Sequence, residues 1–324
     1  MEDYKRDSHE ARCNGLRNRK ACSVENHKYV FADNVEKQDG PFYCPECYSE
    51  AIVRKCIEKD DHFAHKAKLS PVATSKDQKL HNLCRDSICS YLKEKFPDGK
   101  WEIERPIKAN ETKGTKERIP DISGRIDKTP IAIEVQKTAY TLNRIAEKTE
   151  DYNKLGISVL WVVPLYEELG NDAFRPRLYE KYLHCMYYGR IYYWSPLNIT
   201  KIIPVHYSPT KRYIEVSSFF DVDLKEEVSF GGYYQTYKTL KTPDFWGVLD
   251  ISTMFKSHYR KSFIPKEEKK AIPNCILYLD KLERWWAKDE HRDIDNQKEV
   301  FRKPFNQDII PTDYYDDYDN YDEI

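Results

Sequence analysis

The sequence predicts an α/β core between residues 71 and 165, built in the order helix, three strands, helix, strand. Three observations lead to this fold class. Apolar residues recur at helical spacing in residues 78–92 and again in residues 142–152. Polar residues interrupt the apolar run at 131–136 on one face only, which fits a strand. Residues 157–164 form an apolar run apart from Ser158, as expected for a strand buried on both faces.

The first helix is expected to run from about Ser75 to Lys95. Ser75 and Gln78 have the spacing of a capping box, in which two side chains bond backbone N–H groups at a helix start. A strand should follow in residues 101–107, where apolar and acidic residues alternate. The apolar face of the helix comprises Leu80, Cys84, Ile88, Tyr91 and Leu92.

The next two strands, residues 118–126 and 131–137, are expected to pair as an antiparallel hairpin, because the turn-forming residues DKTP lie between them. A helix of about four turns follows, with Thr141 as its N-cap and Gly156 as its end. The strand at 157–164 should then lie parallel to the second hairpin strand, because the helix makes a right-handed crossover between them.

Composition divides the rest of the chain into three further regions. Residues 1–70 are rich in cysteine and histidine. Residues 166–295 are rich in aromatic residues and are predicted to form an α+β domain. Within it, residues 274–289 place Ile276, Leu279, Leu282 and Trp286 at helical intervals and predict a packing helix. Residues 296–324 form an acidic tail, which is expected to be disordered.

Charge and cysteine content narrow the class of protein. The formal net charge is -1, so nucleic acid would have to be held by a local basic patch. No run of about 18 apolar residues occurs, and the polar N-terminus has no apolar signal core. The nine cysteines are odd in number and include Cys-x-x-Cys beside histidines, which favours metal binding over disulfides. We therefore expect a soluble cytoplasmic protein without a membrane partner.

A pair of carboxylates makes the predicted hairpin a candidate site. Glu134 and Gln136 point to one face of their strand, because successive side chains alternate. Asp121 lies near the far end of the hairpin ladder, within reach of Glu134. Two converging carboxylates suit Mg²⁺, which takes oxygen ligands and can activate water and neutralise charge on a phosphodiester. The alternative is a turn aspartate and an edge glutamate that face water.

The N-terminal region has the spacing of zinc ligands. Cys44 and Cys47 are separated by two residues, as are His62 and His65. These four side chains suit a closed tetrahedral Zn²⁺ site with a structural role. Cys56 lies between the pairs and could replace one histidine. The alternative is solvent cysteines and a surface histidine pair. Basic neighbours could contact nucleic-acid phosphates or form a solvated rim, namely Arg54, Lys55, Lys66 and Lys68.

Aromatic residues gather around Arg190 in residues 187–194. Rings interleaved with a basic residue can stack on unpaired bases of nucleic acid. The alternative, which we favour, is that these rings form sheet core with tyrosine hydroxyls at its edge.

Together these features resemble the CoiA-like competence protein family, in which a Cys/His zinc-binding segment precedes a nuclease core of the PD-(D/E)xK superfamily. The resemblance lies within residues 40–165. It is carried by FYCPEC, HFAHK, the helix bearing His81, IPD, IAIEVQ and KTEDYNKLGISVLWVV. It implies a restriction-endonuclease-like core.

The resemblance also implies roles for individual residues. Asp121 and Glu134 would ligate Mg²⁺ or Mn²⁺, and Gln136 would take the position of the lysine in the family motif. His81 would assist the metal or the phosphate from the first helix. Glu104, on the first strand, is a second candidate for the catalytic set.

Gln136 is the departure from the superfamily motif. A lysine carries positive charge toward the phosphate, whereas an amide can only hydrogen-bond and orient water. Glu-x-Gln variants do occur in the resembled family. Arg144 or Lys148, on the following helix, could supply the charge, whereas Lys137 points to the opposite strand face.

The expected function is divalent-metal-dependent hydrolysis of DNA during the processing of incoming or foreign DNA. The partners would be DNA and proteins of recombination or defence. A second class is a recombination-accessory protein that binds nucleic acid and keeps the nuclease fold with little or no turnover, and Gln136 supports it. A third is a zinc-organised interaction protein that contacts partners through its aromatic region.

Overall fold

The structure is a computed structural model, and its elements fall into two compact units. One unit comprises Met1–Ser70, Asn171–Arg177 and Tyr207–Pro243, and the other comprises Pro71–Gly170, Leu178–His206 and Asp244–Ile324. The described residues are 19–45, 50–57, 60–66, 68–73, 77–136, 141–214, 216–221, 225–266 and 270–287. Cys47, Ser75, Lys137 and the predicted tail at 296–324 lie outside them. No helix in these ranges is long and apolar enough to cross a membrane.

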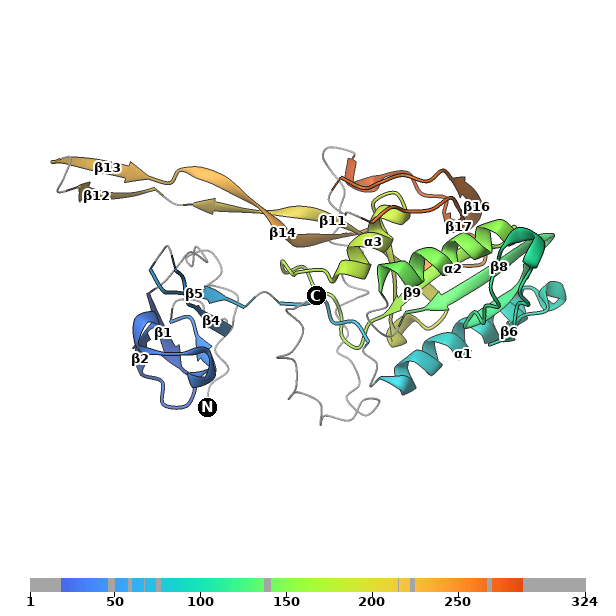
Figure 1. Ribbon diagram of the computed structural model, residues 1–324, viewed down its shortest axis with the longest axis horizontal. Coiled ribbons are helices and arrows are strands. Elements are labelled where there is room, and N and C mark those ends of the chain that lie inside the picture. Colours follow the sequence, from blue (N-terminus) through green and yellow to red (C-terminus); the bar gives the residue numbers. More distant parts are fainter. Residues whose placement is uncertain are drawn as a thin grey trace. The chain divides into compact units, whose positions relative to one another are not determined.

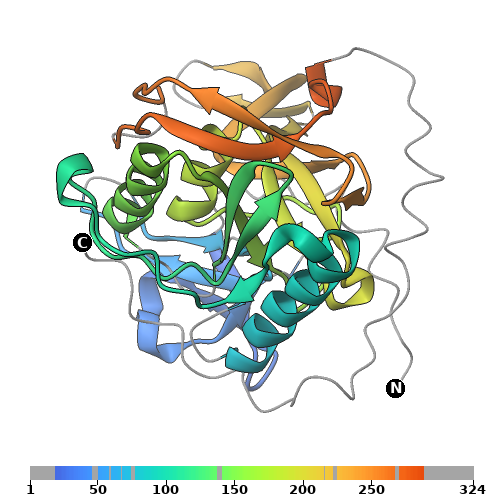
Figure 2. The ribbon, with the colours of Figure 1, turned by 90° about the vertical axis from the view of Figure 1, so that its right-hand side faces the viewer.

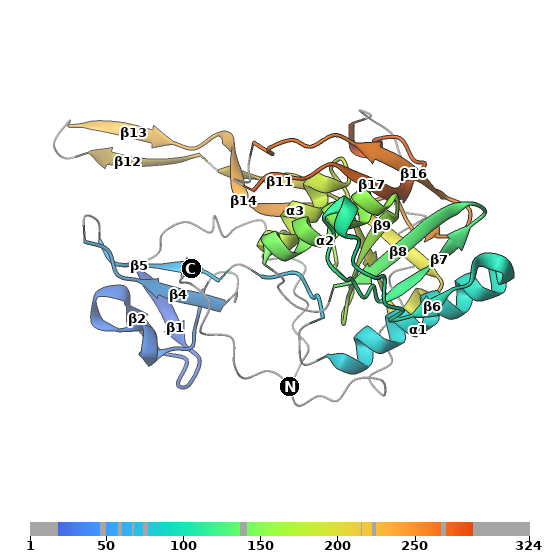
Figure 3. The ribbon, with the colours of Figure 1, turned by 45° about the vertical axis from the view of Figure 1, so that its right-hand side comes forward.

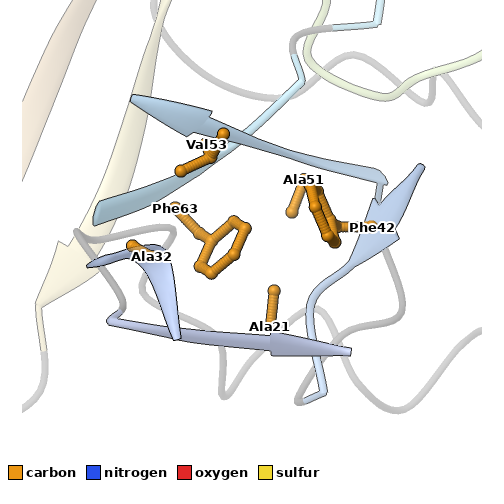
Figure 4. Close-up of a cluster of buried hydrophobic side chains, with 6 residues drawn as sticks. All are labelled: Ala21, Ala32, Phe42, Ala51, Val53 and Phe63. Carbon is orange, nitrogen blue, oxygen red and sulfur yellow. The ribbon is translucent and has the colours of Figure 1, made fainter. Parts of the chain in front are cut away.

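The first unit contains a five-stranded antiparallel sheet in the order β2-β1-β3-β4-β5. Its strands are β1 (Lys20–Ser23), β2 (Tyr29–Phe31), β3 (Phe42–Tyr43), β4 (Glu50–Arg54) and β5 (His62–His65). Side chains on one face of the sheet meet in a small core, shown in Figure 4. In it the rings of Phe42 and Phe63 pack edge to face with centroids 5.1 Å apart. The core is completed by Ala21, Ala32, Ala51 and Val53.

Two long paired strands, β11 (Lys201–Ile214) and β14 (Tyr233–Phe245), contribute residues to both units. Between them in sequence, β12 (Ser217–Asp221) and β13 (Glu226–Phe230) form a separate two-stranded antiparallel sheet. The second unit holds the rest of a ten-stranded sheet, whose path runs β14-β11-β10-β9-β8-β7-β6.

The centre of the second unit is built by residues 78–164. Its elements are α1 (Gln78–Lys95), β6 (Glu102–Ile103), β7 (Ile122–Ile126), β8 (Thr129–Val135), α2 (Leu142–Leu155) and β9 (Ser158–Pro164). Figure 3 shows the sheet strands β6 to β9 beside one another. Strands β8 and β9 lie between the two helices α1 and α2 (Figures 1 and 2).

Helix α2 follows the sequence signals at both ends. The Thr141 hydroxyl accepts a hydrogen bond from the Arg144 backbone N–H at 3.4 Å, which caps the helix start. Gly156 ends the helix with φ 75°, a left-handed conformation that glycine adopts without strain. The crossover makes β8 and β9 parallel, with Glu134 opposite Trp161. The prediction for this helix and for the parallel pairing is confirmed.

Helix α1 and the first strand are shorter than predicted. The helix begins at Gln78, with Asp77 at the N-cap position. The strand comprises Glu102 and Ile103 only, and Glu104 turns out of it with φ 51°. The strand ends because Glu104 takes this left-handed conformation and because Pro106, two residues on, has no backbone N–H to donate to a ladder. Trp101, the residue before the strand, is buried against Gly124 of β7, where an added Cβ would lie 2.3 Å from the Trp101 ring.

The helix predicted at 274–289 is wrong. Residues Cys275–Asp280 form strand β17, which pairs with β16 (Phe255–Arg260) in an antiparallel hairpin. β17 also lies parallel to β9, with Leu277 opposite Val159. Helical and strand patterns cannot be separated in a short apolar run that is buried on both faces. Figure 2 shows this hairpin in orange.

The remaining elements of the second unit are α3 (Leu178–Met186), β10 (Ile191–Trp194) and β15 (Leu249–Asp250). β10 continues the sheet beside the end of β9. The rings of Tyr187, Tyr192, Tyr193 and Trp194 are fully buried here. The interpretation of these four rings as sheet core is therefore confirmed, and they are not available for stacking on bases. Tyr188, the fifth ring of the group, is half-buried, with the guanidinium carbon of Arg260 3.7 Å from its ring centre.

Candidate active site

The candidate site lies where β7 leaves its partner β8. The hairpin register places Ile122 opposite Ile133, so Asp121 is the next residue beyond the ladder, across from Glu134. The backbone N–H of Val135 donates to the Asp121 carboxylate oxygen Oδ2 at 2.8 Å. The Asp121 carboxylate therefore accepts a hydrogen bond that a backbone carbonyl of a paired strand would otherwise accept, and it lies beside the C-terminal end of β8.

Asp121 is held on its other side by α1. The Nε2 atom of His81 lies 3.3 Å from Asp121 Oδ1, and the His81 side chain is buried. Burial by itself would raise the pKa of Asp121. The bonds from His81 and from the Val135 N–H, together with the positive charge of Lys148, outweigh burial and lower its pKa below the ordinary value. Asp121 is therefore ionised at neutral pH.

Glu134 is a buried carboxylate with two donors from α2. Its Oε2 atom accepts a hydrogen bond from the Lys148 ammonium at 2.7 Å, and its Oε1 atom accepts one from the Tyr152 hydroxyl at 2.5 Å. Burial raises the pKa of Glu134 to about 7, with Lys148 opposing this shift and the nearby Asp121 charge adding to it. The carboxyl group can therefore gain or lose a proton near neutral pH.

Lys148 brings a positive charge into this site from the buried face of α2. Its ammonium lies 5.9 Å from the centre of the Trp161 ring on β9, in addition to its contact with Glu134. The sequence pointed to Arg144 or Lys148 as a source of charge. The structure brings Lys148 to the carboxylates and leaves Arg144 exposed on the surface. The Tyr152 contact was missed, although its position four residues after Lys148 places both side chains on one helix face.

Gln136 lies on the same strand face as Glu134, as the alternation predicts. Its side chain is buried, and its backbone N–H donates to the Val162 carbonyl at 2.8 Å. The amide therefore sits two positions beyond Glu134, within the buried end of the sheet.

Glu104 is placed differently from the predicted strand position. Its carboxylate pairs with Arg85 of α1 at 2.6 Å and is 57% exposed, so it forms a surface ion pair. Only its backbone reaches the site, through an N–H bond of 3.1 Å to the Asp121 carbonyl. Its prediction as an acid facing away from Trp101 on a strand is wrong, because the chain turns at this residue.

A second contact joins α2 to the segment before Asp121, and sequence reasoning missed it. The Arg118 guanidinium donates to Asp151 Oδ2 at 2.7 Å, and both side chains are largely buried. Asp151, Lys148 and Tyr152 lie on one face of α2, three and four residues apart. The helix therefore contacts both the strand that carries Glu134 and the segment that leads to Asp121.

The donor set at this site fits a hard divalent cation. Asp121 and Glu134 supply carboxylate oxygens, which Mg²⁺ and Mn²⁺ prefer, and the ionised Asp121 supplies a negative charge. Within the described ranges, no group of three or more His, Cys, Asp or Glu side chains is arranged to hold a metal ion. An ion at these two carboxylates would therefore complete its coordination with water, as Mg²⁺ commonly does.

His62 and His65, two of the predicted zinc ligands of the first unit, pair with different ends of β4. His62 pairs with Arg54 at the C-terminal end of β4, and its Nδ1 atom lies 3.7 Å from the Cys56 sulfur. His65 pairs with Ala51 near the other end of β4. Three residues apart on a strand, the two histidines point to opposite faces. The strand HFAH therefore separates the two imidazoles, and which of them joins Cys44 in a zinc site stays a prediction.

Cys44 lies at the same end of β4 as His65. It directly follows Tyr43, which pairs with Glu50, and its side chain is buried. Cys47 lies outside the described residues. No disulfide bond joins the cysteines within the described ranges, namely Cys22, Cys44, Cys56, Cys84, Cys89, Cys185 and Cys275. Zinc binding stays a prediction, and Cys44 and His65 both lie at the N-terminal end of β4.

Comparison with known proteins bears on this site directly. No curated protein and no solved structure matches the chain. Two protein-family models do match. The N-terminal domain of competence protein CoiA matches residues 25–71, and the nuclease-like domain of competence protein CoiA matches residues 78–207. The second match contains every residue of the candidate site, and the two matches together cover more than half of the chain. The chain therefore belongs to the CoiA-like competence protein family.

Proposed function

We propose that this protein is a divalent-metal-dependent nuclease that hydrolyses phosphodiester bonds of DNA. The observation that carries the proposal is the meeting of Asp121, Glu134 and Lys148 at the end of β8, with Lys148 2.7 Å from Glu134. Two carboxylates beside a buried cation combine the groups that phosphodiester hydrolysis needs, which are metal ligands and a positive charge near the phosphate. The nuclease-like family match supports this assignment.

The residues of the chain divide the work. Asp121 and Glu134 would hold Mg²⁺ or Mn²⁺, and the ion would supply Lewis acidity and a lowered pKa for water. His81 and the Val135 N–H fix the orientation of Asp121. Tyr152 fixes Glu134 by donating to its Oε1 atom. Because Asp121 stays ionised and Glu134 titrates near pH 7, the metal site is ready for a cation at and above neutral pH.

Lys148 supplies the charge that Gln136 cannot. In the resembled motif a lysine stands two residues after the glutamate on the strand, whereas here an amide does. The ammonium of Lys148 reaches the carboxylate of this glutamate, Glu134, from α2. An ammonium stabilises negative charge that develops on a phosphate, whereas an amide only donates a hydrogen bond. Gln136 would then orient water or a phosphate oxygen.

The second candidate function is an accessory protein that binds nucleic acid with little or no turnover. The observation in its favour is that the Lys148 ammonium is already paired with Glu134, both side chains being buried. A cation held in this way contributes less charge to a substrate. Cleavage assays separate the two candidates.

Other properties complete the proposal. The residues 78–164 would form a restriction-endonuclease-like core, and the N-terminal sheet would bind a structural zinc ion. The biological role would be processing of incoming or foreign DNA in the cytoplasm, in competence, recombination or defence, with proteins of those processes as partners. Membership of a competence protein family supports this role.

The test is cleavage of linear double-stranded and single-stranded DNA in Mg²⁺ or Mn²⁺. Wild-type protein should cleave, and Asp121→Ala and Glu134→Ala should lose about 100-fold or more of the rate. Glu147→Ala is the matched control, because Glu147 is an exposed acid on the same helix as Lys148. Cleavage that persists in both site variants would remove the assignment. Binding without cleavage by the wild-type chain would favour the accessory function.

A further inference from the structure

The outer face of the N-terminal sheet carries exposed aromatic rings. Tyr29 and Phe31 on β2 are 65% and 45% exposed, although rings of this size are usually largely buried. Their neighbour Val30 points the other way and packs against the core. The alternation along β2 therefore directs two rings to solvent, while the opposite face of the sheet holds the core of Figure 4.

Cross-strand pairing extends this face over three strands. Cys22 of β1 lies opposite Tyr29 on one side and opposite Tyr43 of β3 on the other. Directly opposed residues of antiparallel strands share one face, so the two tyrosines flank Cys22 in one row. Lys20 lies opposite Phe31 in the next row, with its ammonium 5.7 Å from the centre of that ring.

Positive charge accompanies the rings. By the same alternation, Lys20, Arg54 and Lys66 point outward. Lys66 pairs at 2.9 Å with Glu50, which lies opposite Tyr43, and Arg54 lies four residues farther along β4, on the side away from Phe31. Protein interfaces exclude charged residues from their centres, whereas surfaces for single-stranded nucleic acid interleave cations with rings. The rings of Tyr29 and Phe31, two residues apart on a strand, are separated by about 7 Å and can each receive a base.

We propose that this outer face, formed by Lys20, Tyr29, Phe31, Tyr43 and Arg54, binds single-stranded nucleic acid by stacking bases on its rings. The backbone phosphates would contact Lys20 and Arg54. The inference rests on the proposed function only for the class of ligand. It adds a second place, apart from the candidate active site, where a substrate strand is held.

The test measures binding apart from cleavage. Full-length protein carrying Asp121→Ala is titrated into labelled oligothymidylate or oligouridylate of about 15 nucleotides, and fluorescence anisotropy gives the affinity. Tyr29→Ala and Phe31→Leu should each weaken binding about 5- to 100-fold, because each removes a stacking ring. Phe31→Leu keeps an apolar side chain on β2, and Tyr29→Phe, which keeps the ring, should bind as wild type does. Lys20→Gln should lower the slope of log affinity against log salt by about 1.

Tyr259→Ala is the matched control, because Tyr259 is a 57% exposed tyrosine on β16 of the other unit. Its affinity should equal that of the parent. Equal affinity in the Tyr29→Ala, Phe31→Leu double variant, or no affinity in the parent, would overturn the proposal. Loss of self-association in that variant without a change in oligonucleotide binding would instead identify a protein interface. If binding depends on the rings but the wild-type protein does not cleave DNA, the proposed nuclease function is refuted and the binding surface is not. If the wild-type protein cleaves DNA but binding does not depend on the rings, the binding surface is refuted and the nuclease function is not.

Discussion

The Lys148 ammonium lies 2.7 Å from the Glu134 carboxylate, and the exposed fractions of these side chains are 9% and 2%. A helix residue thereby brings positive charge to Glu134, two residues before Gln136, which stands where the motif has its lysine. Lys148→Met should lower the rate of DNA cleavage about 100-fold, because it removes the side-chain cation that is proposed to act at the phosphate beside the metal ion.

Lys154→Met is the control for that variant, since Lys154 is an exposed lysine on the same helix, paired with Glu150. Its cleavage rate should match wild type. In the Lys148→Met background, Gln136→Lys should recover part of the activity by placing an ammonium on the face that carries Glu134. Undiminished cleavage by Lys148→Met would show that this cation has no catalytic part.

Stability should reveal the same pair by a double-mutant cycle. Glu134→Gln and Lys148→Met should each lower the free energy of unfolding by about 3 to 5 kcal/mol, because each leaves the other group buried without its charge partner. The double variant should lose less than the sum, with a coupling of about 1 to 3 kcal/mol. Urea unfolding followed by circular dichroism gives the four values, and strict additivity would argue against a direct interaction.

The pH dependence of stability should carry opposite signs at the two carboxylates. The folded pKa of Glu134 is about 7 and exceeds its ordinary value of 4.5, so the folded state binds more protons between these values. Without added divalent cation, stability should therefore fall as pH rises from about 4.5 to 7. The lowered pKa of Asp121 stabilises the fold above its ordinary value of 3.8, and that contribution should be lost as pH falls further.

Glu134→Gln isolates the first of these effects. The variant has no group that titrates at this position, so its urea midpoint should not decline between about pH 4.5 and 7 beyond the change at other groups. Metal affinity gives an independent reading. Mn²⁺ binding by wild type, followed calorimetrically, should release a proton at pH 6 and almost none at pH 8.5, because Glu134 must ionise to bind the ion. Proton release that is the same at both values would contradict the raised pKa.

Arg118 should act as a positioning residue. Its bond to Asp151 holds the segment before Asp121 against α2. Arg118→Ala should lower stability by about 3 kcal/mol and kcat about tenfold, with KM for DNA unchanged, because the guanidinium is engaged inside the protein. Arg118→Lys should restore part of both. Lys116→Ala, at a 76% exposed side chain, should change neither, and an equal rise in KM would instead place Arg118 at the substrate.

Zinc content should distinguish the two histidines of β5. Because His65 lies at the end of β4 near Cys44 and His62 lies at the other end beside Cys56, Cys44→Ser and His65→Ala should lose bound zinc. His62→Ala should keep it. Elemental analysis of purified protein measures about one ion per chain where the site is intact. Zinc loss in His62→Ala alone would show that the ligands gather at the Cys56 end.

The parts of the fold that could be predicted are those set by local sequence. Thr141 and Gly156 bound α2 through a hydroxyl and a left-handed backbone, and both effects act over a few residues. Glu104 and residues 275–280 were predicted wrongly, since each depends on distant partners. Glu104 leaves the strand with a left-handed backbone and pairs with Arg85 of α1, and pairing with β9 makes a strand of an apolar run with helical spacing.

The candidate site shows the same division. Alternation along β8 was enough to place Glu134 and Gln136 on one face. The choice between Lys148 and Arg144 required the packing angle of α2 on the sheet, which no residue spacing specifies. Residue spacing predicts only an apolar helix face in residues 142–152, and the hydroxyl contact of Tyr152 with Glu134 follows from three-dimensional packing.

Strand β17 lies beside β9, yet 110 or more residues separate them in the chain, and the match to the nuclease-like domain ends at residue 207. During synthesis the backbone edge of the N-terminal half of β9 stays unpaired until β17, which ends at Asp280, has left the ribosome. The growing chain is then open to pairing with strands of other molecules. A fragment cut at the end of the family match, residue 207, would keep this edge unpaired, so we expect the segment with the candidate site to aggregate more readily without β17 than with it.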